Sequence, residues 1–209
     1  MRTAPGALSP LATETHALIE QILRTVDGAK DFETDVAWAA EQIDAIRARL
    51  APHARLVGLN LGRPADPPAG RPFYVSGVLG GPHHPMTMPI DLATSEGITT
   101  GRVNLDIAWE GPPGCVHGGY VAHLLDCIMG QHNLNVGIPG MTGTLTIRYR
   151  QPTPLCTNLR FEVRTDERVG RKIASKAEIW AGKALCAEAD GIFIVPARPL
   201  GDAPGWDED

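Results

Sequence analysis

The stretch His-Gly-Gly-Tyr-Val-Ala-His-Leu-Leu-Asp, residues 117–126, decides the fold of this chain. It follows a run rich in proline and glycine, from Glu110 to Gly114, as residues just before a helix often do. Downstream, apolar residues recur every three or four positions, which predicts a long helix buried along one side. The residues of this apolar stripe are Val121, Leu124, Leu125, Ile128 and Met129.

Two glycines open the predicted helix, although each costs about 1 kcal/mol relative to alanine inside a helix. The N–H groups of a first helical turn have no partner within the helix. Without side chains at Gly118 and Gly119, a carbonyl oxygen or an anion can reach these N–H groups at the positive end of the helix dipole. The helix start is therefore a candidate oxyanion site.

Asp126 places a carboxylate in the same apolar run. It follows Gly118 by eight residues, which is about 12 Å along a helix that rises 1.5 Å per residue. A catalytic group must lie within about 3 Å of the reacting atom or its water. One helix therefore cannot supply both groups to one substrate, and we expect a site at a homodimer interface. The alternative is that Asp126 is an ordinary solvated or hydrogen-bonded acid.

The overall composition is that of a globular protein, with 43% hydrophobic and 21% charged residues. The net charge of −5 gives no sign of a nucleic-acid partner. No apolar run approaches the roughly 18 residues of a membrane span, and the first residues lack the pattern of a secretory signal. The sequence therefore predicts a cytoplasmic protein.

The four cysteines form no C-x-x-C pair and no spacing typical of a zinc site, so we expect reduced thiols and no metal. Cys115 and Cys127 flank the candidate site, and His117 and His123 lie nearby in sequence. A cysteine nucleophile with a histidine base is therefore a minor alternative to Asp126.

Three segments make up the predicted domain organisation: a tail and helical extension at 1–72, a β-rich domain at 73–196 and a flexible acidic tail at 197–209. Within the extension, helices are predicted at 11–25 and 33–51. Their apolar stripes either pack on the main domain or bind a partner. A proline-rich loop at 60–72 separates the extension from the β-rich domain.

Alternating apolar and polar residues predict strands on both sides of the central helix. The predicted strands are 73–79, 86–93, 98–109, 144–150, 159–166, 172–180 and 184–195. A hairpin turn is predicted at Arg168–Arg171. One sheet with an apolar face and one long helix indicate an α+β fold in which the sheet wraps around the helix.

These features resemble the hotdog-fold acyl-CoA thioesterases of the PaaI/THEM4 type. The matching segments are Glu110–Gly119, Leu125–Asp126 and Met141–Leu155, all within the range from about 98 to 195. The resemblance implies a hotdog fold, with an antiparallel sheet of five or six strands around one long helix. It also implies a homodimer, able to stack into a tetramer, with two sites at the dimer interface.

The resemblance further implies hydrolysis of an acyl-CoA to a carboxylic acid and free CoA, with CoA present as part of the substrate and no other cofactor. The amide of Gly118 would polarise the thioester carbonyl, and Asp126 would act as general base or nucleophile. Thr142 would orient the water or the acid. In some relatives an asparagine six residues before the motif histidine also binds the carbonyl, but this chain has Gly111 there.

Further substrate contacts are expected from residues near the helix start and the following strand. These are His117, Gly119, Tyr120, His123 and Thr144. His117 could instead close the loop over the helix start, Tyr120 and His123 could simply pack, and Thr144 is the substitute hydroxyl if Thr142 has no role. Basic residues on the last strands either bind the phosphates of CoA or form a solvated sheet face.

Two other functions compete with hydrolysis. One is a hotdog module without catalytic activity that binds acyl-CoA, or binds a protein through the N-terminal helices. The other is a hydratase or dehydratase, although the sequence lacks an Asp–His arrangement suited to that chemistry.

Overall fold

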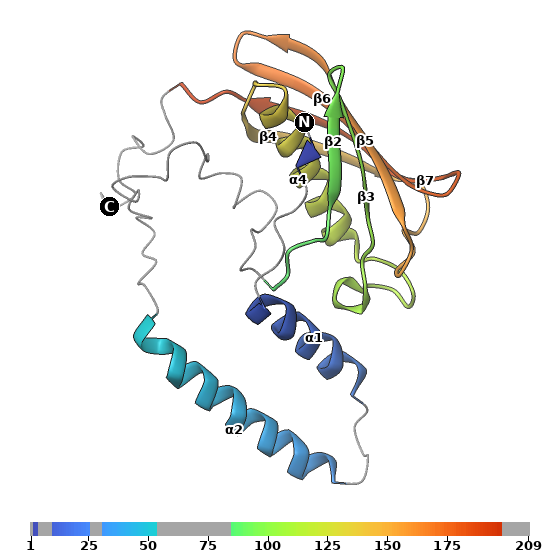
Figure 1. Ribbon diagram of the computed structural model, residues 1–209. Coiled ribbons are helices and arrows are strands. Elements are labelled where there is room, and N and C mark those ends of the chain that lie inside the picture. The colour runs from blue at the N-terminus through green and yellow to red at the C-terminus, as the bar shows by residue number, and fades with distance from the viewer. Residues whose placement is uncertain (1, 4–9, 26–30, 54–84, 198–209) are drawn as a thin grey trace, which may run out of the picture.

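The computed structural model describes residues 2–3, 10–25, 31–53 and 85–197 (Figure 1). Some predictions lie outside this range, namely the strand at 73–79, the loop at 60–72 and nearly all of the tail at 197–209. The boundary between the extension and the β-rich domain therefore stays a prediction. No helix in the described ranges is long and apolar enough to cross a membrane.

The described elements follow the predicted order of helical extension, two strands, long helix and four strands, preceded by a two-residue strand. The helices are α1 (Pro10–Arg24), α2 (Phe32–Leu50), η1 (Ala51–His53), η2 (Ile107–Trp109) and α4 (Gly118–Asn135). The strands are β1 (Arg2–Thr3), β2 (Asp91–Ser95), β3 (Ile98–Val103), β4 (Met141–Tyr149), β5 (Leu159–Val169), β6 (Lys172–Ala181) and β7 (Ala184–Ile194).

The strands form one antiparallel sheet in the order β1-β2-β3-β5-β6-β7-β4. With seven strands, it is wider than the five or six expected, because the short β1 adds to one edge. At the other edge β4 pairs only with β7 among the described strands. The side of β4 that faces away from β7 has no partner strand among the described residues.

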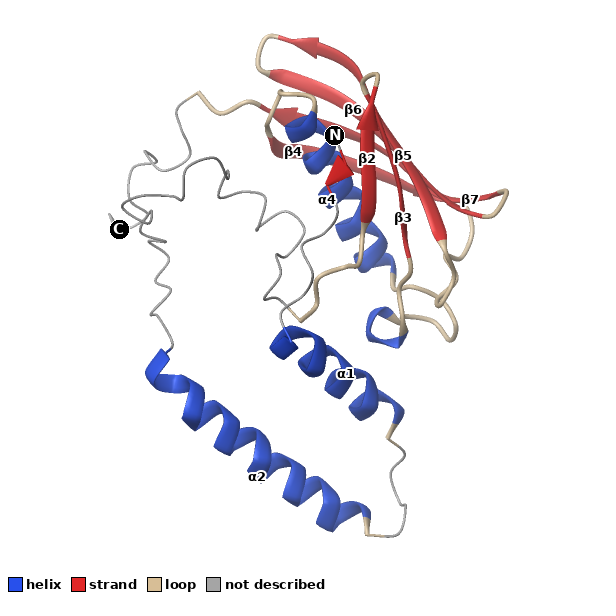
Figure 2. Ribbon diagram, in the orientation of Figure 1, coloured by secondary structure: helices blue, strands red, loops and turns tan. Residues whose placement is uncertain are grey.

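Helix α4 lies along one face of this sheet, as Figure 2 shows. All five residues of the predicted apolar stripe are at most 2% exposed and belong to the core. Full burial of such side chains contributes about 1.5–3 kcal/mol each. The sheet approaches the helix so closely that a Cβ added at Gly191 would lie 2.7 Å from Met129 Cε. The predicted α+β hotdog arrangement of a sheet around one helix is therefore confirmed.

Two predicted strands were placed wrongly. The one expected at 86–93 begins only at Asp91, and the one expected at 98–109 ends at Val103. Residues 107–109 instead form η2, because the Asp106 carboxylate accepts the N–H of Ala108 and caps that turn. Aspartate side chains compete with strand pairing in this way. Leu105 and Trp109 are buried as a strand would require, but the backbone between them is not a strand.

The two N-terminal helices differ in how they pack. Helix α1 packs on η2: His16 stacks on Trp109, with ring centroids 4.9 Å apart, and its Nε2 lies 2.8 Å from Asp106 Oδ2. Helix α2 has no buried residue in its 19 residues. Packing on the main domain is thus confirmed for α1, whereas binding of a partner through α2 stays a prediction.

The C-terminal part of α4 carries a buried polar network. His132 is 0% exposed, with Nδ1 2.8 Å from Thr99 Oγ1 and Nε2 3.1 Å from Thr165 Oγ1. Burial lowers the pKa of His132 below its ordinary value of 6.5, because the charged imidazolium is poorly solvated there. The core therefore favours the neutral ring.

This burial predicts acid sensitivity of the fold. As the pH falls below about 6.5 the unfolded chain protonates His132 before the folded one does, so the free energy of unfolding should decrease. Urea denaturation between pH 8 and pH 5 should show a steeper loss for the natural chain than for His132→Gln. The exposed His123 provides the control substitution His123→Gln, which should keep the natural slope. Equal slopes for all three proteins would contradict the prediction.

Candidate active site

The start of α4 leaves one amide unpaired. His117 is the N-cap, and its Nδ1 accepts the N–H of Gly119 at 3.0 Å. The carbonyl of His117 accepts the N–H groups of Tyr120 and Val121, at 2.8 and 3.1 Å. Within the described part of the chain, no hydrogen bond uses the N–H of Gly118. The first turn therefore offers a single amide donor to an incoming group, at the position expected from the sequence.

This geometry gives His117 a structural role at the start of the helix. Because Nδ1 accepts a backbone N–H, that nitrogen carries no proton, and the neutral ring bears its proton on Nε2. The ring is thus a structural cap that aligns the first turn. Its Nε2 is still available to a ligand, since the side chain lies on the exposed side of the helix start.

The loop before the helix explains why this chain has glycine where some relatives have asparagine. A Cβ at Gly111 would lie 2.6 Å from Cα of His117, so any side chain there would displace the cap. The loop is fixed by a hydrogen bond from Gly111 N–H to the Cys115 carbonyl, and by one from His117 N–H to the Trp109 carbonyl. A second carbonyl ligand from position 111 is therefore absent.

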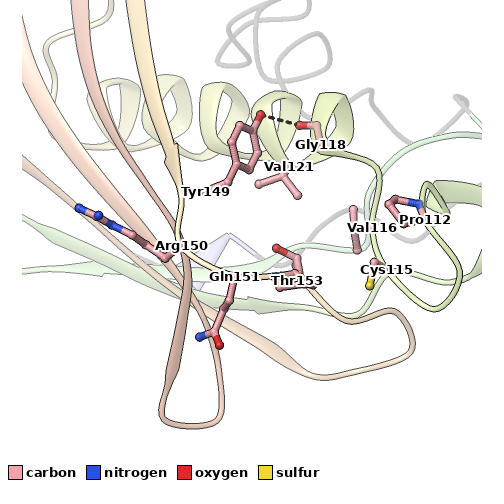
Figure 3. Close-up of a pocket in the computed structure, with 10 residues that line it drawn as sticks. Pro112, Cys115, Val116, Gly118, Val121, Tyr149, Arg150, Gln151 and Thr153 are labelled. Carbon is pink, nitrogen blue, oxygen red and sulfur yellow. Dashed lines mark hydrogen bonds between the residues drawn. The ribbon is translucent and has the colours of Figure 1, made fainter.

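Tyr149, at the end of β4, contacts the helix start and was not among the predicted site residues. Its hydroxyl donates a 2.9 Å hydrogen bond to the carbonyl of Gly118, as Figure 3 shows. A Cβ built on Gly118 would lie 3.7 Å from the Tyr149 ring, which is ordinary van der Waals contact. The aromatic residue closing the strand seven positions after Thr142 was the only sequence signal for this contact.

Asp126, in the middle of α4, meets Thr142 near the start of β4. The Thr142 hydroxyl donates a 2.6 Å hydrogen bond to Asp126 Oδ1, which orients the carboxylate. Asp126 is half-buried on α4 and Thr142 is exposed on β4. Thr144 lies beyond a bulge in the β4–β7 pairing and makes no hydrogen bond to Asp126 in the described structure. The carboxylate and hydroxyl expected to work together are therefore adjacent in one protomer.

The remaining predicted substrate contacts share one open cavity of about 710 Å³. Its lining comprises Met86, Trp109, Glu110, His117, Gly119, Tyr120 and His123. A second, smaller cavity of about 260 Å³ lies against Gly118 and Tyr149. Residues of the first turn of α4 thus line both cavities, Gly118 the smaller and Gly119 the larger.

The cysteine alternative meets an electrostatic obstacle. Cys127 Sγ lies 3.7 Å from both ring nitrogens of His123, as a nucleophile and its base would. However, burial, and then the negative charge of Asp126, raise the pKa of the Cys127 thiol to about 12. A thiolate at Cys127 is strongly disfavoured, which argues against this residue as the nucleophile.

The basic residues of the last strands lie mainly on a charged sheet surface. Arg148 donates to Asp190 at 2.7 Å, Arg150 pairs with Glu188, and Lys176 pairs with Asp166. The hydrogen bond from Lys176 is also the main reason why the pKa of Asp166 is lowered. These pairs favour the solvated sheet face over a dedicated phosphate site.

One group of potential metal ligands lies outside the site, where α1 meets η2. The ligand atoms of His16, Glu20 and Asp106 fall within 4.8 Å of one another. His16 already contacts Asp106 and the carbonyl of Pro85, and Glu20 pairs with Arg24 at 3.4 Å. The contacts of His16 attach α1 to the main domain, and this accounts for the cluster without a metal ion.

Comparison with known proteins supports the family resemblance. No family model matches the chain. It is 33% identical over 87 residues to the acyl-coenzyme A thioesterase THEM4 of Bos taurus, covering 41% of this chain and 35% of that protein. The Mus musculus THEM4 is 34% identical over 95 residues, covering 44% and 41%. The chain thus spans well under half the length of these curated relatives.

A solved structure of a thioesterase superfamily protein matches more completely. Its TM-score is 0.75 at 29% identity, and the match covers 93% of this chain and 95% of that one. A match over 93% of this chain is longer than the predicted β-rich domain at 73–196, so it includes part of the N-terminal extension. The resemblance to hotdog-fold thioesterases is confirmed.

The thiol chemistry can be tested directly. With a pKa of about 12 and 5% exposure, Cys127 should resist alkylation by iodoacetamide at pH 8, where about one thiol in ten thousand would be ionised. Peptide mapping by mass spectrometry should find the exposed Cys156 labelled much earlier, which makes it the internal control. If Cys127 is labelled at least as fast as Cys156, the prediction is wrong and Cys127 is again a candidate nucleophile.

Proposed function

We propose that this chain is an acyl-CoA thioesterase, which hydrolyses its substrate to a carboxylic acid and free CoA. The observation that carries the proposal is the unpaired N–H of Gly118 at the positive end of α4, which suits a developing oxyanion. The names of the THEM4 relatives support the same class of reaction for this chain.

The proposed reaction uses Asp126 as a general base. Its carboxylate takes a proton from water, and the water oxygen bonds to the thioester carbon. The carbonyl oxygen gains negative charge and is held by the N–H of Gly118. Collapse of this intermediate breaks the carbon–sulfur bond and releases CoA thiolate, which is then protonated. Thr142 fixes the carboxylate through its 2.6 Å hydrogen bond. In the alternative mechanism Asp126 itself attacks the thioester carbon, and water then hydrolyses the resulting acyl-enzyme intermediate.

A second protomer is needed because Gly118 and Asp126 lie about 12 Å apart along one helix. The open edge of β4 suggests how it is placed. Asp126 and Thr142 lie near one end of β4, while Gly118 and Tyr149 lie near the other. Antiparallel pairing of two β4 strands would bring opposite ends together, so that Asp126 of the partner subunit faces Gly118. We therefore propose a homodimer with two equivalent sites.

The substrate would approach each site along the flanking cavities. His117, Gly119, Tyr120 and His123 line the larger one and are proposed to contact the CoA portion. A cytoplasmic location accords with this role and remains a prediction. A module that only binds acyl-CoA is the second candidate, and release of free thiol from acyl-CoAs distinguishes the two.

The amide of Gly118 can be removed by one substitution, Gly118→Pro. Proline lacks the N–H, is well tolerated at the first helical position, and requires an extended residue before it. His117 already has φ −60° and ψ 135°, so the backbone can accept the ring. We expect kcat to fall about 10²–10³-fold, as when one oxyanion donor is lost elsewhere. Thiol release monitored with a chromogenic thiol reagent measures this.

The matched control is Gly118→Ala, which keeps the N–H and adds a methyl group at ordinary contact distance from Tyr149. It should lose far less activity than Gly118→Pro. Equal losses in two well-folded variants would mean that the amide is not the oxyanion donor. No thiol release from any acyl-CoA by the natural chain would favour the binding module.

A further inference from the structure

The proposed mechanism assigns no part of the substrate to the smaller cavity beside the helix start. This cavity has a volume of about 260 Å³ and lies where the loop before α4 meets the end of β4. Its lining comprises Pro112, Cys115, Val116, Gly118, Val121, Tyr149, Arg150, Gln151, Pro152 and Thr153. Pockets that hold a whole drug-sized ligand are roughly 300–1,000 Å³. This one therefore suits a part of a substrate.

The two long polar side chains of this lining are occupied elsewhere, and Thr153 is its remaining hydroxyl besides Tyr149. Arg150 pairs with Glu188, and Gln151 donates to the carbonyl of Leu185 at 2.8 Å. In Figure 3 both side chains extend away from the helix. What remains toward the cavity is mainly the Tyr149 ring and the side chains of Val116 and Val121. The cavity thus presents an apolar surface.

The lining of the larger cavity combines the apolar side chains of Met86 and Trp109 with three ionisable ones. It presents Glu110, His117 and His123, which lose solvation if an alkyl chain covers them. A chain rich in amide groups would instead find hydrogen-bonding partners there. A thioester has an acyl group on one side of its carbonyl and a thiol carrier on the other. The less polar, smaller cavity suits the acyl group, and the larger cavity suits the polar carrier.

We propose that the cavity lined by Val116, Val121 and Tyr149 holds the acyl group and limits the enzyme to short acyl chains. This assignment rests on the proposed thioesterase function. Gly118 lies in the cavity wall, so an acyl group inside it has its carbonyl beside the unpaired amide. Tyr149 connects the cavity to the start of α4, because its ring forms part of the cavity wall and its hydroxyl donates a hydrogen bond to the Gly118 carbonyl.

Chain-length profiles of variants test the assignment. Val121→Ala enlarges the cavity and should raise the ratio of kcat/KM for octanoyl-CoA to that for butyryl-CoA by about tenfold, since one misfit methylene is worth about 10-fold or more. Cys115→Leu fills the cavity from a partly exposed position and should lower the same ratio. Because Val121 is a core residue, Cys115→Leu keeps the test valid if Val121→Ala folds poorly.

The matched control is Val163→Ala, which removes the same two methyl groups from a fully buried position that lines neither cavity. Its octanoyl to butyryl ratio should equal that of the natural chain. If the natural chain releases thiol but neither cavity variant changes the ratio, the acyl group binds elsewhere and the assignment is wrong. If no acyl-CoA is hydrolysed at all, the thioesterase proposal fails, and the cavity assignment fails with it.

Discussion

The eight-residue separation of Gly118 and Asp126 on one rigid helix is the constraint on which the proposed chemistry depends. The helix cannot bend to bring them together, since its intervening side chains are fixed in the core. Both residues are instead held by β4, through Tyr149 at Gly118 and through Thr142 at Asp126. In the proposed dimer, strand β4 and the helix form one unit that carries two half-sites, each completed by a second copy.

The two ends of helix α4 differ in how far the rest of the protein covers them. Its first turn lines two cavities and has a single unpaired donor. Its last turns are enclosed by the sheet, where His132 is fully buried and bonded to threonines. An element needs such an anchored end if its exposed end is to hold a reacting group in fixed geometry.

Periodicity predicted the central helix, its stripe and the antiparallel strands after it, because those patterns arise from burial on one side of a regular element. It failed at 104–109, where the alternating sequence pattern forms no strand because Asp106 caps a turn. It also overlooked Tyr149, whose position depends on a contact 31 residues away in sequence. The pairing of Thr142 with Asp126 was expected from family resemblance, and spacing alone did not indicate it.

The most direct test of the shared site is complementation between Asp126→Asn and Gly118→Pro chains co-expressed with different tags. Each protein alone should be nearly inactive. Random pairing makes half of the dimers hybrids, and each hybrid has one intact site, so the mixture should recover about one quarter of natural activity. A purified hybrid no more active than either parent would contradict a site built from two protomers.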